Sequence, residues 1–171
     1  MRGKSAIVTG GGSGGIWREI SLALAAEGAK VVVNDIAKNI DGKSVADEVV
    51  KDIIKNKGTA VANYDSVATM KGGENIIKTA INNFGRIDIL VNCAGNFVVA
   101  PITEVTETQW DSIIAVHLKG HFSCAKAAIP EMIKQKNGRI INFSSIGSTF
   151  GTGGVCPAYG TAKAGVLGFT A

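Results

Sequence analysis

Short apolar runs alternate with longer segments of helical spacing along this chain. The runs cover residues 6–8, 31–33, 60–62, 89–91 and 139–143. Between the first four runs, apolar side chains recur at helical spacing over residues 20–24, 45–54 and 76–81. Strands that are covered on both faces read as continuous apolar runs rather than alternating ones. The pattern therefore predicts an α/β fold, in which β-α-β units wind into a doubly wound parallel sheet with helices on both faces.

The second half of the chain predicts two further helices. Thr106 followed by Glu107 is a helix-start signal, and apolar spacing continues from there to Met132, which predicts one long helix. A last helix begins at Ala158 and is still in mid-pattern at Ala171. We therefore expect a truncated chain that lacks the last strands of its fold.

Length and composition fit one globular domain over residues 1–171, because hydrophobic residues make up 46% and charged residues 19%. The net charge is +4, but the basic residues are spread out, so nucleic acid is not an expected partner. Apolar runs are too short to cross a membrane, and no signal-peptide core precedes the first strand, so we expect a cytoplasmic protein. Cys93, Cys124 and Cys156 lack the close spacing of metal sites and are expected to be reduced and structural.

A glycine-rich loop, residues 9–15, joins the first strand to the first helix. Glycines allow a tight turn and let the backbone approach a pyrophosphate, whose charge is favoured by the free N–H groups at a helix start. The loop alone is also compatible with an ordinary flexible turn. If it is a phosphate loop, the residues expected to contact a dinucleotide are Gly10, Gly12, Ser13, Gly14, Gly15 and Ile16.

An acidic residue after the second strand favours the dinucleotide interpretation. Asp35 lies about twenty residues beyond the loop, where a carboxylate accepts hydrogen bonds from the adenosine ribose hydroxyls. The same charge repels a 2′-phosphate, so we expect NAD rather than NADP. Asp65 and Ser66 follow the third strand at the edge where such folds bind ligands, and they are either cofactor contacts or turn residues.

The order of three motifs resembles the short-chain dehydrogenase/reductase family along the whole chain. The motifs are Thr9-Gly10 with Gly14, the segment Asn92-Cys93-Ala94-Gly95, and Tyr159-Gly160-Thr161-Ala162-Lys163. The resemblance implies a Rossmann fold in which Asn92, Ala94 and Gly95 lie along the dinucleotide and help to hold the sheet. It also implies that Lys163 bonds the nicotinamide ribose, that members continue with further strands, and that they form homodimers or homotetramers.

The chemistry of the last motif also follows from its spacing. Tyr159 and Lys163 share one helical face, so the ammonium lies near the phenol and favours its phenolate form. Tyr159 can then exchange a proton with an alcohol or carbonyl oxygen while hydride moves to or from a nicotinamide. Without the other motifs, this pentapeptide would be interpreted as a Tyr-Lys pair on an exposed helix face.

Two serines follow the fifth strand, and one is expected to bond the substrate oxygen. We choose Ser145, because a residue that leaves a strand is better placed for this than one still inside it. Ser144 is the alternative, and a turn serine without a role is the third reading.

The chain departs from the family pattern at three places. An extra loop residue puts Ile16 or Trp17 where the family has its last glycine, and a large side chain there is expected to crowd either the first helix against the strand or the pyrophosphate. His117 replaces the asparagine of a Val-Asn-x-x-Gly segment, and it either takes over that residue's part in a proton relay or is a packed structural histidine. The interval from Ser145 to Tyr159 is one residue longer than the family's.

The resulting expectation is an NAD-dependent oxidoreductase that acts on the hydroxyl or ketone group of a small molecule, including the 3-oxoacyl-reductase type. Its expected catalytic residues are Ser145, Tyr159, Lys163 and His117. Two other classes stay open. One is a dinucleotide-binding module or scaffold without chemistry, and the other is a site for a different nucleotide-like ligand such as a methyl donor.

Overall fold

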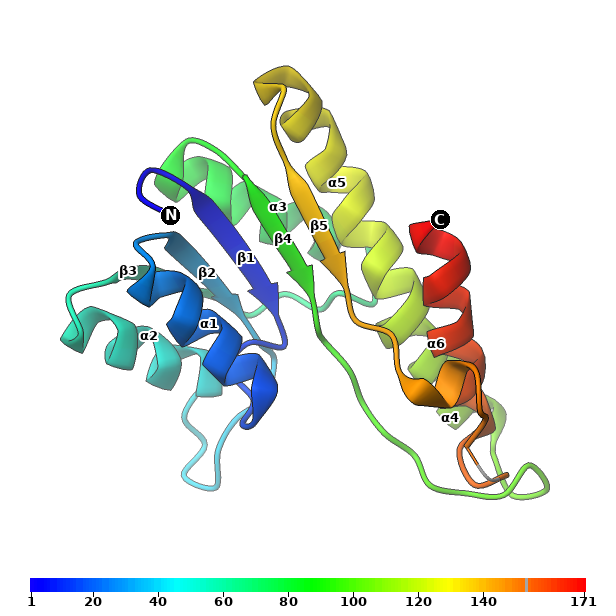
Figure 1. Ribbon diagram of the computed structural model, residues 1–171. Coiled ribbons are helices and arrows are strands. Elements are labelled where there is room, and N and C mark those ends of the chain that lie inside the picture. Colours follow the sequence, from blue (N-terminus) through cyan, green and yellow to red (C-terminus); the bar gives the residue numbers. More distant parts are fainter. Residues whose placement is uncertain (153) are drawn as a thin grey trace.

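A computed structural model describes residues 1–152 and 154–171 and contains one five-stranded parallel sheet in the order β3-β2-β1-β4-β5 (Figure 1). The strands are β1 (Ser5–Thr9), β2 (Lys30–Asn34), β3 (Thr59–Asn63), β4 (Ile89–Asn92) and β5 (Arg139–Asn142). All four pairings are parallel, and the helices cover both faces of the sheet. The predicted doubly wound α/β fold is therefore confirmed.

Alternate residues of the central strand face two different cores. Ala6 and Val8 pack against helices α1 (Ile16–Ala26) and α2 (Val45–Lys55) on one face. Ile7 packs on the other face, against α3 (Met70–Phe84) and α5 (Gly120–Gln135). Because both faces of β1 and β2 are buried, the interior positions of these strands are apolar and their polar residues stand at the ends, which explains the continuous apolar runs.

The predicted long helix is confirmed, with an irregularity in its middle. It consists of α4 (Glu107–Ile114), the π-helical turn η1 (Ala115–Lys119) and α5, which follow one another without a break. Thr106 caps the start of α4 in a capping box with Gln109, as its hydroxyl accepts from the Gln109 backbone N at 3.2 Å. A π-turn inside a helix often marks a functional site.

The last helix, α6 (Pro157–Thr170), lies beyond β5 and packs on the long helix rather than on the sheet (Figure 1). A small separate core joins them, built around Ile113, Ala158 and Ala162. The 3₁₀ turn η2 (Ile146–Ser148) leads from β5 towards α6. This arrangement brings the start of α6 to the edge of the sheet where the strands end.

Two details concern the predictions about β5 and the thiols. β5 ends at Asn142, so the predicted strand over 139–143 was one residue too long, and Ser144 is not part of a strand. The three cysteines are free and buried, as expected of reduced structural thiols. In the described part of the chain, no helix combines the length and the apolar character needed to cross a membrane.

Candidate active site

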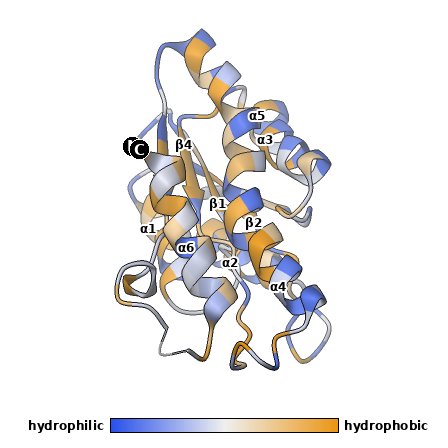
Figure 2. Cartoon of the chain, turned by 90° about the vertical axis from the view of Figure 1, so that its right-hand side faces the viewer, coloured by the Kyte–Doolittle hydropathy of each residue, from blue (hydrophilic) through white to orange (hydrophobic). Residues whose placement is uncertain are grey.

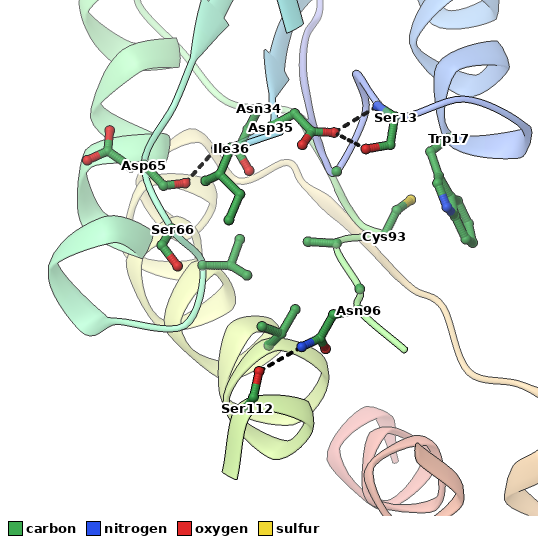
Figure 3. Close-up of a pocket in the computed structure, with 15 residues that line it drawn as sticks. Ser13, Trp17, Asn34, Asp35, Ile36, Asp65, Ser66, Cys93, Asn96 and Ser112 are labelled. Atoms are coloured by element: carbon green, nitrogen blue, oxygen red, sulfur yellow. Dashed lines mark hydrogen bonds between the residues drawn. The ribbon is translucent and has the colours of Figure 1, made fainter. Parts of the chain in front are cut away.

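A cavity of about 260 Å³ opens beyond the carboxyl ends of β1, β2, β3 and β4. This is the edge at which open α/β sheets bind ligands. Seven of the predicted cofactor residues line it: Gly10, Ser13, Asp35, Asp65, Ser66, Ala94 and Gly95. The rest of the wall consists of residues that were not predicted as cofactor contacts: Trp17, Asn34, Ile36, Val67, Cys93, Asn96, Ser112 and Val116 (Figure 3).

Close packing between the ends of β1 and β4 explains the first glycine of the loop. Gly10 has a φ of 68°, and a Cβ atom added there would lie 2.8 Å from the Cα of Ala94. The hydroxyl of Thr9 accepts hydrogen bonds from the backbone N atoms of Cys93 and Ala94, at 3.1 and 3.2 Å. The Thr-Gly motif therefore fastens two loops together at the floor of the cavity.

The rest of the predicted loop contacts lie elsewhere. Gly12 is buried against the start of α2, where an added Cβ would come within 2.6 Å of the Ala46 backbone N. Gly14 and Gly15 are exposed with open space around them, and Ile16 is 65% exposed. These four predicted residues do not line the cavity.

Asp35 is held by the glycine-rich loop itself. One carboxylate oxygen, Oδ2, accepts from both the backbone N and the hydroxyl of Ser13 at 2.7 Å (Figure 3). The other, Oδ1, accepts from the backbone N of Ala37 at 2.9 Å. A carboxylate has about four acceptor positions, so Oδ1 can still accept a hydrogen bond from a ribose hydroxyl. Asp35 is thus oriented, buried and suited to a diol.

Asp65 and Ser66 form the wall next to β3. The Asp65 carboxylate accepts from the side-chain amides of Asn63 and Asn75, both at 2.8 Å, so both of its oxygens already have protein partners. The Ser66 hydroxyl accepts from the backbone N of Ala68 at 3.3 Å, which leaves its own O–H free to donate. Of the two, Ser66 has the free donor for a ligand.

Tyr159 and Lys163 lie on the same side of α6. The Lys163 ammonium is 5.8 Å from the centroid of the Tyr159 ring and donates to the carbonyl oxygen of Phe143 at 2.6 Å. Lys163 is 4% exposed, and its burial lowers the pKa of the ammonium to about 8. The amine therefore stays protonated below that pH while poised to lose its proton just above it.

The two candidate serines have different partners. The Ser144 hydroxyl donates to the backbone carbonyl of Lys163 at 2.8 Å, so its proton is already in use. The Ser145 hydroxyl accepts from the backbone N of Gly147 at 3.2 Å and keeps its proton. A Cβ added at Gly147 would lie 3.6 Å from the Ser145 oxygen and 3.9 Å from the Tyr159 ring, so these two side chains flank one glycine.

The reason given above for choosing Ser145 over Ser144 is wrong, because neither serine is inside β5. Ser145 is still the better candidate, because its hydroxyl keeps a proton that it can donate to a substrate. Ser144 instead ties the end of β5 to the helix that carries Lys163.

His117 lies in the π-turn and packs beneath the loop after β4. Its ring is 5.2 Å from that of Tyr159, and its Nε2 lies 2.7 Å from the carbonyl oxygen and 3.1 Å from the backbone N of Asn96. Which of those two hydrogen bonds forms depends on the tautomer. Burial lowers the pKa of His117, so the ring is neutral at pH 7. A Cβ at Gly95 would come within 2.6 Å of this ring, which explains the glycine there.

Asn92 lies inside the sheet, away from the cavity. Its side-chain N donates to the side-chain oxygen of Asn142 at 2.9 Å, between paired residues of β4 and β5. The missed residue Asn96 does line the cavity, and its side-chain N donates to the Ser112 hydroxyl at 2.8 Å (Figure 3). A polar residue directly after the Ala-Gly pair was the available signal for it.

These residues fit a nicotinamide dinucleotide. An oriented carboxylate for a ribose diol, Asp35, lies at one end, and a phenol with a buried amine lies beyond β5 at the other. Gly10 has no side chain, so the backbone after β1 lies close to that of Ala94 and leaves room for a ligand. Within residues 1–152 and 154–171, no cluster of three or more His, Cys, Asp or Glu side chains is arranged to hold a metal ion.

Comparisons with known proteins agree with this geometry. The family model described as short chain dehydrogenase matches residues 4–171. The chain is 43% identical over 165 residues to a 3-oxoacyl-[acyl-carrier-protein] reductase of Synechocystis, covering 96% of this chain and 64% of that protein. It is 43% identical over 170 residues to the mouse peroxisomal multifunctional enzyme type 2, covering 97% of this chain and 22% of that protein.

A crystal structure of a short chain dehydrogenase from Mycobacterium avium superimposes with a TM-score of 0.91 at 42% sequence identity, covering 99% of this chain and 61% of that one. The chain thus spans less than two thirds of the length of each of these proteins.

Proposed function

The chain belongs to the short-chain dehydrogenase family, a family of oxidoreductases, and we propose that its protein transfers hydride between NAD and an alcohol or ketone. When bound, the nicotinamide supplies or accepts the hydride. The observation that carries the proposal is the pairing of Tyr159 with a buried Lys163 beyond β5, while the oriented carboxylate of Asp35 follows β2 at the same edge of the sheet. The remaining groups of the site support the same reaction.

Tyr159 is the proposed acid/base. In reduction its phenol gives a proton to the carbonyl oxygen, and in oxidation the phenolate takes the proton of the alcohol. Lys163, fixed by the Phe143 carbonyl at 2.6 Å, keeps a positive charge 5.8 Å from the centroid of the Tyr159 ring. Ser145 holds the substrate oxygen with its free hydroxyl, on the other side of Gly147.

His117 has a positioning role in this proposal. Its neutral ring fills the space under Gly95 and lies edge-on to the Tyr159 ring at 5.2 Å. The alternative, a part in a proton relay, stays a prediction.

The proposed substrate has an apolar body. Hydrophobic residues recur along the two loops that extend past the strand ends (Figure 2), and six of their side chains are exposed. They are Phe97, Val99, Ile102, Ile146, Phe150 and Val155. The loops are joined by a hydrogen bond from the Ala100 backbone N to the Val155 carbonyl at 2.8 Å, and the Phe97 ring lies 5.0 Å from that of Tyr159. An acyl chain that carries a ketone at its third carbon suits this surface, which supports the 3-oxoacyl-reductase type.

The proposed cofactor is NAD rather than NADP. The Asp35 carboxylate is 6% exposed and held in place by Ser13, so a 2′-phosphate would bring a second negative charge against it. The expectations of a homo-oligomer and of a cytoplasmic location stay predictions.

The decisive experiment compares two Tyr→Phe variants, because the chain has only two tyrosines. Tyr159→Phe removes the proposed acid/base, and Tyr64→Phe removes an exposed phenol that bonds Asp47. We expect Tyr159→Phe to lose more than 99% of ketone-dependent NADH oxidation (~100-fold or more) with unchanged NADH affinity. Tyr64→Phe should keep both. Unchanged turnover in Tyr159→Phe refutes the assignment, and NADH binding without turnover of any ketone in the wild type favours the non-catalytic module.

A further inference from the structure

Trp17 lies in the dinucleotide site, although the family pattern has a glycine near this position. It is the second residue of α1, and its side chain lines the cavity together with Gly10, Ser13 and Cys93 (Figure 3). The order of strand ends along the sheet edge is β2, β1, β4, β5. The indole, which follows β1, reaches past the end of β4 to the end of β5, where it meets Phe143. It therefore lies between Asp35 and the Tyr-Lys pair.

The contact with Phe143 fixes the indole. The two rings pack edge to face, with centroids 4.9 Å apart and planes at 89°. The carbonyl of the same Phe143 accepts the hydrogen bond from Lys163. Within the described residues, the one side-chain hydrogen bond at Trp17 is received by its backbone carbonyl, from the Ser21 hydroxyl at 3.3 Å. The indole N–H thus keeps its donor.

Two backbone N–H groups of the glycine-rich loop already donate hydrogen bonds within the protein and are not free to bind a pyrophosphate. The backbone N of Gly11 donates to the Asn34 carbonyl at 3.0 Å, and that of Ser13 donates to Asp35 at 2.7 Å. Gly14 and Gly15 are exposed, away from the cavity. A phosphate between the ribose at Asp35 and the nicotinamide at Lys163 therefore meets few loop amides.

We propose that Trp17 is a cofactor-binding residue, whose indole N–H donates to a pyrophosphate oxygen of the dinucleotide and replaces a loop amide. This inference rests on the proposed function, because it requires a dinucleotide in this cavity. It also explains how a loop with an inserted residue and a bulky side chain can remain a phosphate site. The Trp17 ring closes the cavity wall while its contact with Phe143 holds the donor in place.

The test separates the N–H from the ring. Trp17→Phe keeps an aromatic ring against Phe143 and removes the donor, so NADH affinity should fall about tenfold, as for one hydrogen bond to a charged group. Binding of adenosine, which has no phosphate, should not change. The matched control is Trp110→Phe, which alters the chain's other tryptophan, on α4, and should leave NADH affinity unchanged. Binding is measured by the enhancement of NADH emission and, for adenosine, by calorimetry.

A second readout comes from the control variant itself. With Trp17 as the sole tryptophan, Trp110→Phe should show quenching of indole emission on NADH addition. NADH affinity unchanged in Trp17→Phe, or adenosine and NADH affinities that fall together, overturns the inference. If neither the wild type nor Trp110→Phe binds NADH, the proposed function fails instead, so the two failures are distinguishable.

Discussion

Asp88 is the residue whose loss should destabilise the sheet most directly. It lies just before β4, at the edge opposite the cavity, and is 2% exposed. Its carboxylate accepts from the Arg86 guanidinium at 2.6 and 2.7 Å, from the Ser5 backbone N at 3.0 Å and from the Lys4 ammonium at 3.1 Å. The Asn137 side chain also donates to it, at 2.8 Å. One carboxylate thus joins the start of β1, the start of β4 and the turn before β5.

The pKa of Asp88 gives the magnitude. Burial by itself raises it, but the hydrogen bonds from Arg86, Ser5 and Lys4 outweigh burial and lower it from 3.8 to about 2. Each pKa unit corresponds to about 1.4 kcal/mol, so the ionised form contributes about 2 kcal/mol to the free energy of unfolding. Because the folded pKa lies below the unfolded one, this contribution is present above pH 4. It is lost as the pH falls towards 2, with about half gone at pH 3.

Asp88→Asn tests this reasoning by urea unfolding between pH 3 and 7. At pH 7 we expect a loss of about 2 kcal/mol, and at pH 3 a smaller gap from the wild type. Glu74→Gln is the control, because Glu74 pairs with Lys71 and Lys78 on an exposed helix face, so the substitution should cost less than about 0.5 kcal/mol. Equal losses at both pH values would mean that Asp88 acts through shape rather than charge, and would refute the reasoning.

Three further outcomes follow from the contacts described. Burial lowers the pKa of Lys163 from 10.5 to about 8. As the pH rises from 8 to 10.5, the free energy of unfolding of the wild type should therefore increase by about 3 kcal/mol relative to that of Lys163→Met, as measured by urea titrations. Turnover should fall above pH 8, as measured by a pH–rate profile. Gly72→Ala should destabilise the fold by several kcal/mol in thermal unfolding, because the added Cβ would lie 1.9 Å from the Ser66 carbonyl oxygen. In the control Gly168→Ala, the added Cβ meets nothing within 4 Å, so this substitution should be neutral or stabilising. Thr106→Ala removes the capping box of α4 and should cost about 1 kcal/mol, measured by the same thermal unfolding.

Local signals in the sequence were sufficient for the fold. The continuous apolar runs predicted the strands because both faces of the sheet are buried, and Thr106 followed by Glu107 marked the start of the long helix. The end of β5 was missed by one residue because Phe143 is as apolar as the strand before it. The π-turn around His117 was not predicted, since a helix with one extra residue in a turn keeps nearly the same apolar spacing.

The site was harder to predict than the fold because its contacts join strand ends that are distant in the sequence. Asp35 was found from its place after β2, but its bonds to Ser13 exist only because β1 and β2 are neighbours in the sheet. Trp17 meets Phe143, which is distant in the sequence, because the first turn of α1 reaches the residue that follows β5. A glycine motif therefore predicts where a phosphate loop lies, whereas the donors left free for a ligand depend on which strands the sheet places side by side. In this chain the backbone N–H groups of Gly11 and Ser13 already bond Asn34 and Asp35, and the Trp17 side chain lines the same cavity.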